Sequence, residues 1–140
     1  MATLEGGCLC GAVRYEASGL SGPIVHCHCR TCRKAHGAAF ATTARAPRSG
    51  FRWTQGADAV RSYESSPGKR RHFCARCGSH MMAEWQAEDE VILRLGTLDS
   101  DPGSRPVAHI WTEQKAPWYE LEAVLPAIPQ GRPRKGPETG

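Results

Sequence analysis

The sequence predicts a mainly β protein of a single domain, built from short strands. Its 15 glycines and 10 prolines favour frequent turns over long helices. Nowhere does apolar spacing at i, i+3, i+4 and i+7 persist over three helical turns. A chain of 140 residues fits one domain whose core is large enough to be stable alone.

Candidate strands follow one another between turn signals. In 11–17, Val13, Tyr15 and Ala17 alternate with polar residues, which predicts a half-buried strand. Gly- and Pro-rich turns are expected at 18–23, 47–50, 65–68 and 99–104. Segment 30–36 could form a single helical turn or a loop. Further strands are expected at 24–29, 38–44, 51–54, 60–64, 70–74, 81–85, 91–98, 107–112 and 118–122.

The two ends of the chain add little to this core. Residues 129–140 contain no apolar side chain able to join it, so we expect a domain at 1–128 followed by a disordered basic tail. The first five residues have neither a basic nor an apolar region, and apolar runs elsewhere are short. We therefore expect a cytoplasmic protein without a membrane partner.

Seven cysteines carry the main chemical signal. They form a C-x-C pair, a C-x-C-x-x-C triplet and a C-x-x-C pair, at Cys8, Cys10, Cys27, Cys29, Cys32, Cys74 and Cys77. An odd number of clustered thiols in a reducing compartment favours metal binding over disulfides. Tetrahedral zinc takes four such ligands in a closed structural site, or three beside an open position in a reactive one.

The two outer pairs predict a structural site of Cys8, Cys10, Cys74 and Cys77. A glycine follows each pair, at Gly11 and Gly78, where it permits φ > 0 and lets its N–H turn towards a thiolate. C-x-x-C can reach the required sulfur spacing through a tight turn, and C-x-C can reach it on a strand. The alternative is four buried free thiols.

The triplet Cys27, Cys29 and Cys32 predicts an open metal site with catalytic potential. If 24–29 is extended, Cys27 and Cys29 share one face, and Cys32 can return through the next turn. The fourth ligand could be water, an external thiol or a histidine such as His36. A histidine there would make this a second closed structural site, and metal binding only with substrate is also open.

Basic residues flank the thiols. Arg33 and Lys34 follow the triplet, and Arg71 precedes Cys74. Cations near a cysteine favour its thiolate, and these three could also hold the carboxylates of an acidic thiol such as glutathione. Each could instead be a solvated surface charge. His109 could act as a general acid–base group or be structural.

The net charge gives little support to a nucleic-acid partner. The formal charge is +4. Four thiolates with one zinc carry −2 and three with one zinc carry −1, which would leave the protein near +1. A nearly neutral domain is a poor general nucleic-acid binder.

Taken together, these motifs resemble the glutathione-dependent formaldehyde-activating enzyme family, which also includes centromere protein V. The resemblance spans about residues 6–120 and holds all seven cysteines in the family order. The matching elements are Gly7-Cys8-Leu9-Cys10-Gly11, Cys27-His28-Cys29-Arg30-Thr31-Cys32-Arg33, Phe73-Cys74-Ala75-Arg76-Cys77-Gly78, Gly96-Thr97-Leu98-Asp99 and His109-Ile110-Trp111.

The resemblance implies a zinc-binding β-tent of short antiparallel strands, with its sheets joined near a structural metal. It assigns one zinc to the four outer cysteines and a second to the triplet, near which glutathione would bind as co-substrate. The family's named reaction joins formaldehyde to glutathione, a carbon–sulfur lyase activity in reverse. Two other readings are a non-catalytic zinc or glutathione-binding module and, less favoured, a nucleic-acid or chromatin adaptor.

Overall fold

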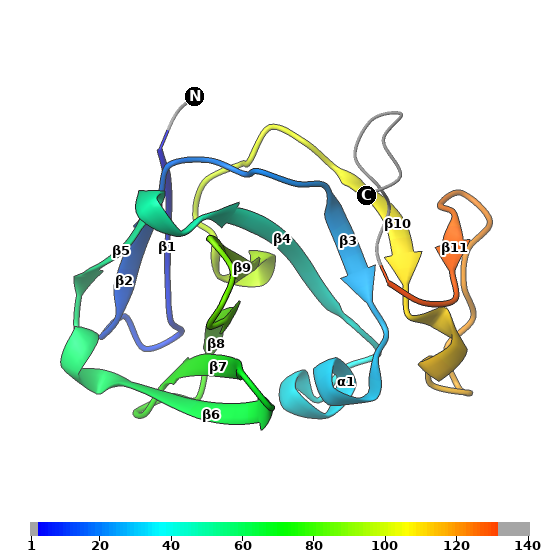
Figure 1. The fold of residues 1–140 in the computed structure, drawn as a ribbon, viewed down its shortest axis with the longest axis horizontal. Coiled ribbons are helices and arrows are strands. Elements are labelled where there is room, and N and C mark those ends of the chain that lie inside the picture. The colour runs from blue at the N-terminus through cyan, green and yellow to red at the C-terminus, as the bar shows by residue number, and fades with distance from the viewer. Residues whose placement is uncertain (1–2, 132–140) are drawn as a thin grey trace.

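The computed structural model describes residues 3–131, which form two sheets and one short α-helix (Figure 1). The smaller sheet has the order β1-β2-β5 and the larger has the order β11-β10-β3-β4-β9-β8-β7-β6. The strands are β1 (Leu4–Gly7), β2 (Arg14–Ala17), β3 (Ile24–Cys27), β4 (Ala41–Pro47), β5 (Phe51–Gln55), β6 (Val60–Ser66), β7 (Lys69–Cys74), β8 (His80–Trp85), β9 (Glu90–Arg94), β10 (Pro106–Ile110) and β11 (Ala127–Ile128). The helices are α1 (Arg30–His36) and the 3-10 turns η1 (Arg48–Gly50), η2 (Ala57–Ala59), η3 (Leu95–Thr97) and η4 (Thr112–Gln114).

The prediction of a mainly β domain is confirmed, with departures in strand pairing and in strand content. β10 pairs in parallel with both β3 and β11, whereas all other pairings are antiparallel. The strand expected at 118–122 is wrong. Its first residue, Trp118, is 70% exposed, and the Tyr119 N–H donates to the carbonyl of Ala116 in a turn instead. Lys115 Nζ fixes this turn by donating to the Tyr119 carbonyl at 2.8 Å.

β1 was not expected from the sequence, because half of it is glycine. Gly6 lies against the side chain of Tyr15, and a Cβ there would come within 2.6 Å of the Tyr15 hydroxyl. Only glycine therefore allows β1 to pair closely with β2 at this point. Tyr15 is fully buried, and its hydroxyl makes a 2.6 Å hydrogen bond with Thr97. The strand expected at 91–98 accordingly stops at Arg94 and turns through η3.

The core has two parts. The larger part lies around Tyr15 and includes Val13, Met81 and Leu93. The smaller part lies around the triplet and contains Val25, Cys27, Cys32, Ala41, Ala108 and Ile110. Two of the three triplet cysteines thus belong to a packed apolar cluster, which fixes their positions.

Segment 30–36 is a helix, which decides between the two expectations for it. Its N-cap is Cys29, whose sulfur accepts the Cys32 N–H at 3.4 Å. Gly37 ends the helix in the left-handed conformation (φ 59°), as is usual for a C-terminal glycine. Cys32 is its one buried residue, so α1 rests on the protein through the triplet.

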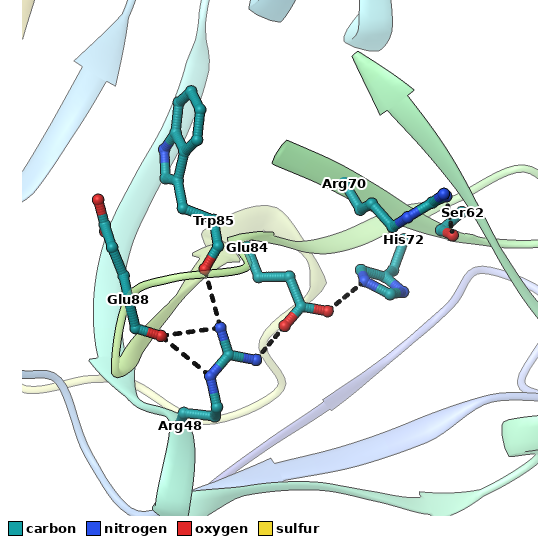
Figure 2. Close-up of polar contacts among 7 residues, drawn as sticks. All are labelled: Arg48, Ser62, Arg70, His72, Glu84, Trp85 and Glu88. Carbon is teal, nitrogen blue, oxygen red and sulfur yellow. Dashed lines mark hydrogen bonds and ion pairs between the residues drawn. The ribbon is translucent and has the colours of Figure 1, made fainter. Parts of the chain in front are cut away.

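A polar network ties the end of β4 to β8 (Figure 2). The strand register places His72 and Glu84 of this network on the opposite face of the large sheet from Tyr63 and Arg71. Glu84 accepts from Arg48 and from His72 Nε2, the latter at 2.6 Å. Arg48 also donates to the carbonyls of Trp85 and Glu88 at 2.9–3.1 Å. Burial would raise the pKa of Glu84, but the hydrogen bonds from Arg48 and His72 lower it overall.

Two further expectations concern the ends and the membrane. Most of the tail predicted at 129–140 lies outside the described residues, and the domain boundary stays a prediction. Within the described part, the Pro129 carbonyl accepts from Glu113 N–H at 3.3 Å. No helix between residues 3 and 131 is long and apolar enough to cross a membrane.

We predict that Glu84→Ala lowers the free energy of unfolding by about 1–3 kcal/mol, because Arg48 and His72 both lose a partly buried partner. Since the pKa of Glu84 is lowered, this contribution is full above the ordinary glutamate pKa and is lost as the pH falls through the lowered value. Urea unfolding at pH 7 and pH 3 measures both effects. The matched control is Glu88→Ala, which removes only an exposed pair with Arg45 and should cost less than about 1 kcal/mol. Equal losses in the two variants would contradict the assignment.

Candidate metal centres

The four outer cysteines meet at one point, as predicted. Their sulfur atoms all lie within 4.8 Å of one another. The Sγ atoms of Cys8 and Cys10 are 3.6 Å apart, and those of Cys10 and Cys74 are 3.8 Å apart. Tetrahedral coordination with Zn–S bonds of about 2.3 Å requires roughly 3.8 Å between sulfurs. The residues present therefore fit one tetrahedral metal ion.

The two glycines do what the sequence predicted for their backbone, but not for their N–H groups. Gly11 and Gly78 have φ of 82° and 81°. Their N–H groups donate to the carbonyls of Cys8 and Cys74, respectively, and not to a sulfur. The glycines thus close the turns, and they leave the sulfurs to other donors. The C-x-C pair also lies in the turn after β1, and the expected strand geometry is wrong there.

Other backbone N–H groups approach the sulfurs. Val13 N–H donates to Cys8, and Arg76 N–H donates to Cys74, each at 3.3 Å. Hydrogen bonds from the Ser79 side chain and backbone lower the pKa of Cys77 to about 5. Such donors stabilise thiolates, which are the form that binds metal.

The triplet forms a second cluster with one side left open. Cys27 ends β3, Cys29 caps α1 and Cys32 lies in its first turn, and the three sulfurs lie within 4.8 Å of one another. In the part of the chain that the structure describes, no histidine or carboxylate joins this cluster. His36 instead packs its ring against His80, with centroids 5.0 Å apart. The geometry therefore favours three protein ligands over a site closed by His36.

The three thiols of this cluster do not behave alike. The pKa of Cys29 is lowered, because Cys27, Cys32, the Thr31 hydroxyl and the Cys32 N–H all donate to its sulfur. The pKa of Cys27 is raised by its hydrogen bonds with Cys29 and Cys32 and by burial. Cys29, which is partly exposed, therefore ionises before Cys27.

Two of the three predicted cationic residues, Lys34 and Arg71, line a common cavity beside Thr31, and Arg33 does not line it. Arg71 is buried, with its Nη atoms 3.8 and 3.9 Å from Cys32 Sγ. Its remaining donors bind Thr31 and Ser65 at 3.0 and 2.9 Å. Arg71 thus serves the triplet and has no open fork for a substrate. Arg33 and Lys34 lie on α1, and neither lines the cavity on which Cys27 and Cys32 open.

That cavity has a volume of about 290 Å³ and contains residues that the sequence analysis did not single out. Arg94, Lys69, Arg45 and Trp85 line it beside the two cysteines. Trp111, which belongs to one of the motifs that match the family, also lines it. One signal in the sequence could have indicated this cavity. Arg94 is a charged residue that directly follows the apolar run Val91-Ile92-Leu93, and no acidic residue stands beside it.

Two buried histidines lie behind the triplet. His28 Nε2 and His109 Nδ1 are 2.7 Å apart, and His109 Nε2 lies 2.6 Å from Glu122. Burial lowers the pKa of His28 to about 4, so its ring is neutral at pH 7. Ile110 lines the cavity, whereas His109 precedes it on β10 and points to the other face. His109 therefore does not reach the cavity, where it would have to lie to act as the general acid–base group considered above.

Comparison with known proteins places the chain in a family. Residues 3–114 match the family model described as "Glutathione-dependent formaldehyde-activating enzyme". The chain belongs to this family. A Halomonas elongata protein named "Putative glutathione-dependent formaldehyde-activating enzyme" is 32% identical over 129 residues, which cover 86% of this chain and 82% of that protein. A crystal structure of a Rhodobacter sphaeroides protein shares the fold, with a TM-score of 0.61 and 23% identity over 89% of this chain and 99% of that one.

For this family member we predict that Cys74→Ser abolishes stable folding. The change leaves three thiols around an incomplete site, and a structural zinc contributes on the order of 10 kcal/mol to folding, as much as a whole domain's stability. Circular dichroism melting and zinc content per chain measure the outcome. Soluble Cys74→Ser protein with an unchanged melting temperature and full zinc content would rule out the structural assignment.

We predict that Cys29→Ser keeps the fold and loses the second metal. The triplet spans six residues, so closing its loop adds little stability. Serine also keeps an N-cap oxygen for the Cys32 N–H, which makes this substitution mild for α1. We expect one zinc fewer per chain and a loss of stability of no more than about 2 kcal/mol. Unfolding as severe as that of Cys74→Ser would contradict the division into two kinds of site.

Proposed function

We propose that this protein is a zinc-dependent enzyme of the carbon–sulfur lyase type that acts on a glutathione–aldehyde adduct. One observation carries the proposal: three cysteine sulfurs gather beside a cavity, and no fourth described side chain closes the cluster. Membership of a family described as glutathione-dependent and formaldehyde-activating supports glutathione and a small aldehyde as its substrates. Zinc at the four outer cysteines would have a structural role.

In this proposal the triplet supplies the reactive position. A zinc ion held by Cys27, Cys29 and Cys32 would offer a coordination position to an incoming thiol or polarise the aldehyde oxygen. Arg71 offsets the negative charge of the thiolates from 3.8 Å, and the packed cluster around Cys32 keeps the sulfurs in place. The cavity wall limits the directions from which a small substrate can arrive.

The reaction itself forms a C–S bond and an O–H bond, and it breaks the S–H bond and the carbonyl π bond. The glutathione sulfur attacks the aldehyde carbon, a C–S bond forms, and the carbonyl π electrons move to oxygen. The thiol proton ends on that oxygen, giving S-(hydroxymethyl)glutathione from formaldehyde. The lyase direction reverses each step. None of the described histidines lines the cavity beside the triplet, so water is the proton carrier in this scheme.

The second candidate is a non-catalytic zinc or glutathione-binding module. The buried Arg71 lies next to Cys32 and offsets the charge of the thiolate cluster without any substrate. This contact favours the second candidate. Turnover separates the two candidates. The enzyme must accelerate adduct formation or cleavage above the spontaneous reaction of glutathione with formaldehyde, and Cys29→Ser must abolish the acceleration.

We predict that reduced glutathione binds the zinc-loaded protein and that its thiol is required. S-methylglutathione keeps both carboxylates but cannot supply a thiolate to a zinc centre, so it should bind at least about tenfold more weakly. Calorimetry at low and moderate salt compares the two compounds. Equal affinities would show that basic residues alone hold the ligand, and binding of neither would favour the structural-module candidate.

A further inference from the structure

The cavity beside the triplet has a wall whose charge the proposed reaction does not use. β-strand alternation and register place Lys69, Arg71 and Arg94 on one face of the large sheet. Arg71 lies opposite Ala83, which lies opposite Ile92, and Lys69 and Arg94 are each two residues from a member of this row. Trp85 lies opposite Lys69 on the same face. Figure 2 shows its ring pointing away from the Arg48–Glu84 pair.

Arg94 lacks partners in this wall. It is 4% exposed, and its Nε and Nη2 atoms are buried without a hydrogen-bond partner among the described residues. Its neighbour across the strands is Thr43, which also lines the cavity. A buried guanidinium with unpaired donors is costly, and such groups are normally satisfied by an acceptor. The unpaired donors of Arg94 therefore point to a ligand that brings acceptor oxygens.

The charge around the cavity also leaves a positive excess. Three thiolates with one divalent ion carry −1, whereas Arg71, Arg94 and Lys69 carry +3. No aspartate or glutamate between residues 3 and 131 lines the cavity. Arg45, the third cation in the lining, is already paired with Glu88 and lies 3.8 Å from Glu90. The site around the triplet thus keeps a net charge of about +2, which an entering anion would lower.

Lys69 is the second cation that an entering anion would meet. Its Nζ lies 5.3 Å from the centroid of the Trp85 ring in a cation–π arrangement, and no carboxylate of residues 3–131 forms an ion pair with it. Burial lowers the pKa of Lys69, as do the charges of Arg94 and Arg71. A bound anion would reverse that effect and favour the charged amine.

We propose that Arg94 is a carboxylate-binding residue, assisted by Lys69, and that the molecule presented to the triplet carries a carboxylate. This deepens the proposed function, on which it rests for the placement of the reacting group. Guanidinium binds carboxylate through two parallel N–H···O bonds, which matches two unpaired donors on one buried arginine. Formaldehyde needs neither this charge nor a cavity of about 290 Å³. The carboxylate could come from an arm of glutathione or from a small acidic thiol or aldehyde.

Calorimetry on the zinc-loaded protein with two small thiols tests the subsite without glutathione. 3-Mercaptopropionate and 3-mercaptopropionamide are similar in size, and only the first carries a carboxylate. The wild type should bind the acid at least about tenfold more tightly than the amide. Arg94→Met should bring this ratio close to one, and Lys69→Met should reduce it in part. Arg45→Met, in the same wall but already paired, should keep the wild-type ratio.

Metal content and melting temperature accompany each titration, so that loss of zinc is not mistaken for loss of the subsite. Arg94→Met should melt no lower than the wild type without ligand, because it removes a buried charge with unpaired donors. Arg94→Gln serves as a second variant if Arg94→Met does not fold. A wild-type ratio near one, or a ratio that persists in the folded Arg94 and Lys69 variants, overturns the proposal.

A last comparison identifies the source of the carboxylate. If glutathione and its glycine ethyl ester differ in the wild type but not in Arg94→Met, the carboxylate is the glycine arm of glutathione. If the ester binds as well as glutathione while the small acid keeps its preference, a separate acidic molecule occupies the subsite. Arg94-dependent binding of the small acid with no glutathione binding would sustain the subsite and reject the proposed function. Thiol-dependent binding of glutathione, without any preference for 3-mercaptopropionate over its amide, would support the proposed function and reject the carboxylate subsite.

Discussion

The four-cysteine cluster is the constraint on which the rest of the structure depends. It joins turns that are far apart in the chain, since Cys10 and Cys74 are separated by 64 residues and their sulfurs are 3.8 Å apart. One turn connects β1 to β2 in the small sheet, and the other connects β7 to β8 in the large one (Figure 1). Because β7 also carries Lys69 and Arg71, the cluster fixes the cations relative to the triplet as well.

Strand alternation divides the chemistry of the large sheet between its two faces. On β3, Cys27 faces the cavity, and the neighbouring His28 packs against His109 behind it. On β8, Trp85 lines the cavity, whereas Glu84 holds Arg48 and His72 on the other side (Figure 2). The polar networks behind the sheet therefore support the strands that carry the thiols and cations, and they do not themselves reach a substrate.

The two cysteine clusters could be predicted from the sequence because their members occur in short C-x-C and C-x-x-C motifs with metal-ligand spacing, even where two motifs far apart in the chain share one cluster. The mainly β fold followed from the alternation of Val13, Tyr15 and Ala17. The cavity could not be predicted, because it depends on register: Arg94 meets Thr43 only once β9 pairs with β4. β1 also needed tertiary information, since Gly6 is required only because Tyr15 packs against it. Arg33 and Lys34 were nearest to the triplet in sequence, yet neither lines the cavity on which Cys27 and Cys32 open.

Arg94 can lie buried with unpaired donors because other parts of the molecule stabilise the fold. A buried guanidinium without partners costs a few kcal/mol, which a small domain can tolerate only if other elements are strongly held. The four-cysteine cluster and the Tyr15 core do not include Arg94, so the packing of that core does not depend on the pairing of its guanidinium. Arg94 can therefore remain unpaired in the free protein, so that its interaction energy becomes available when a ligand enters. An internal acidic partner would have stabilised the fold and filled the position that a carboxylate needs.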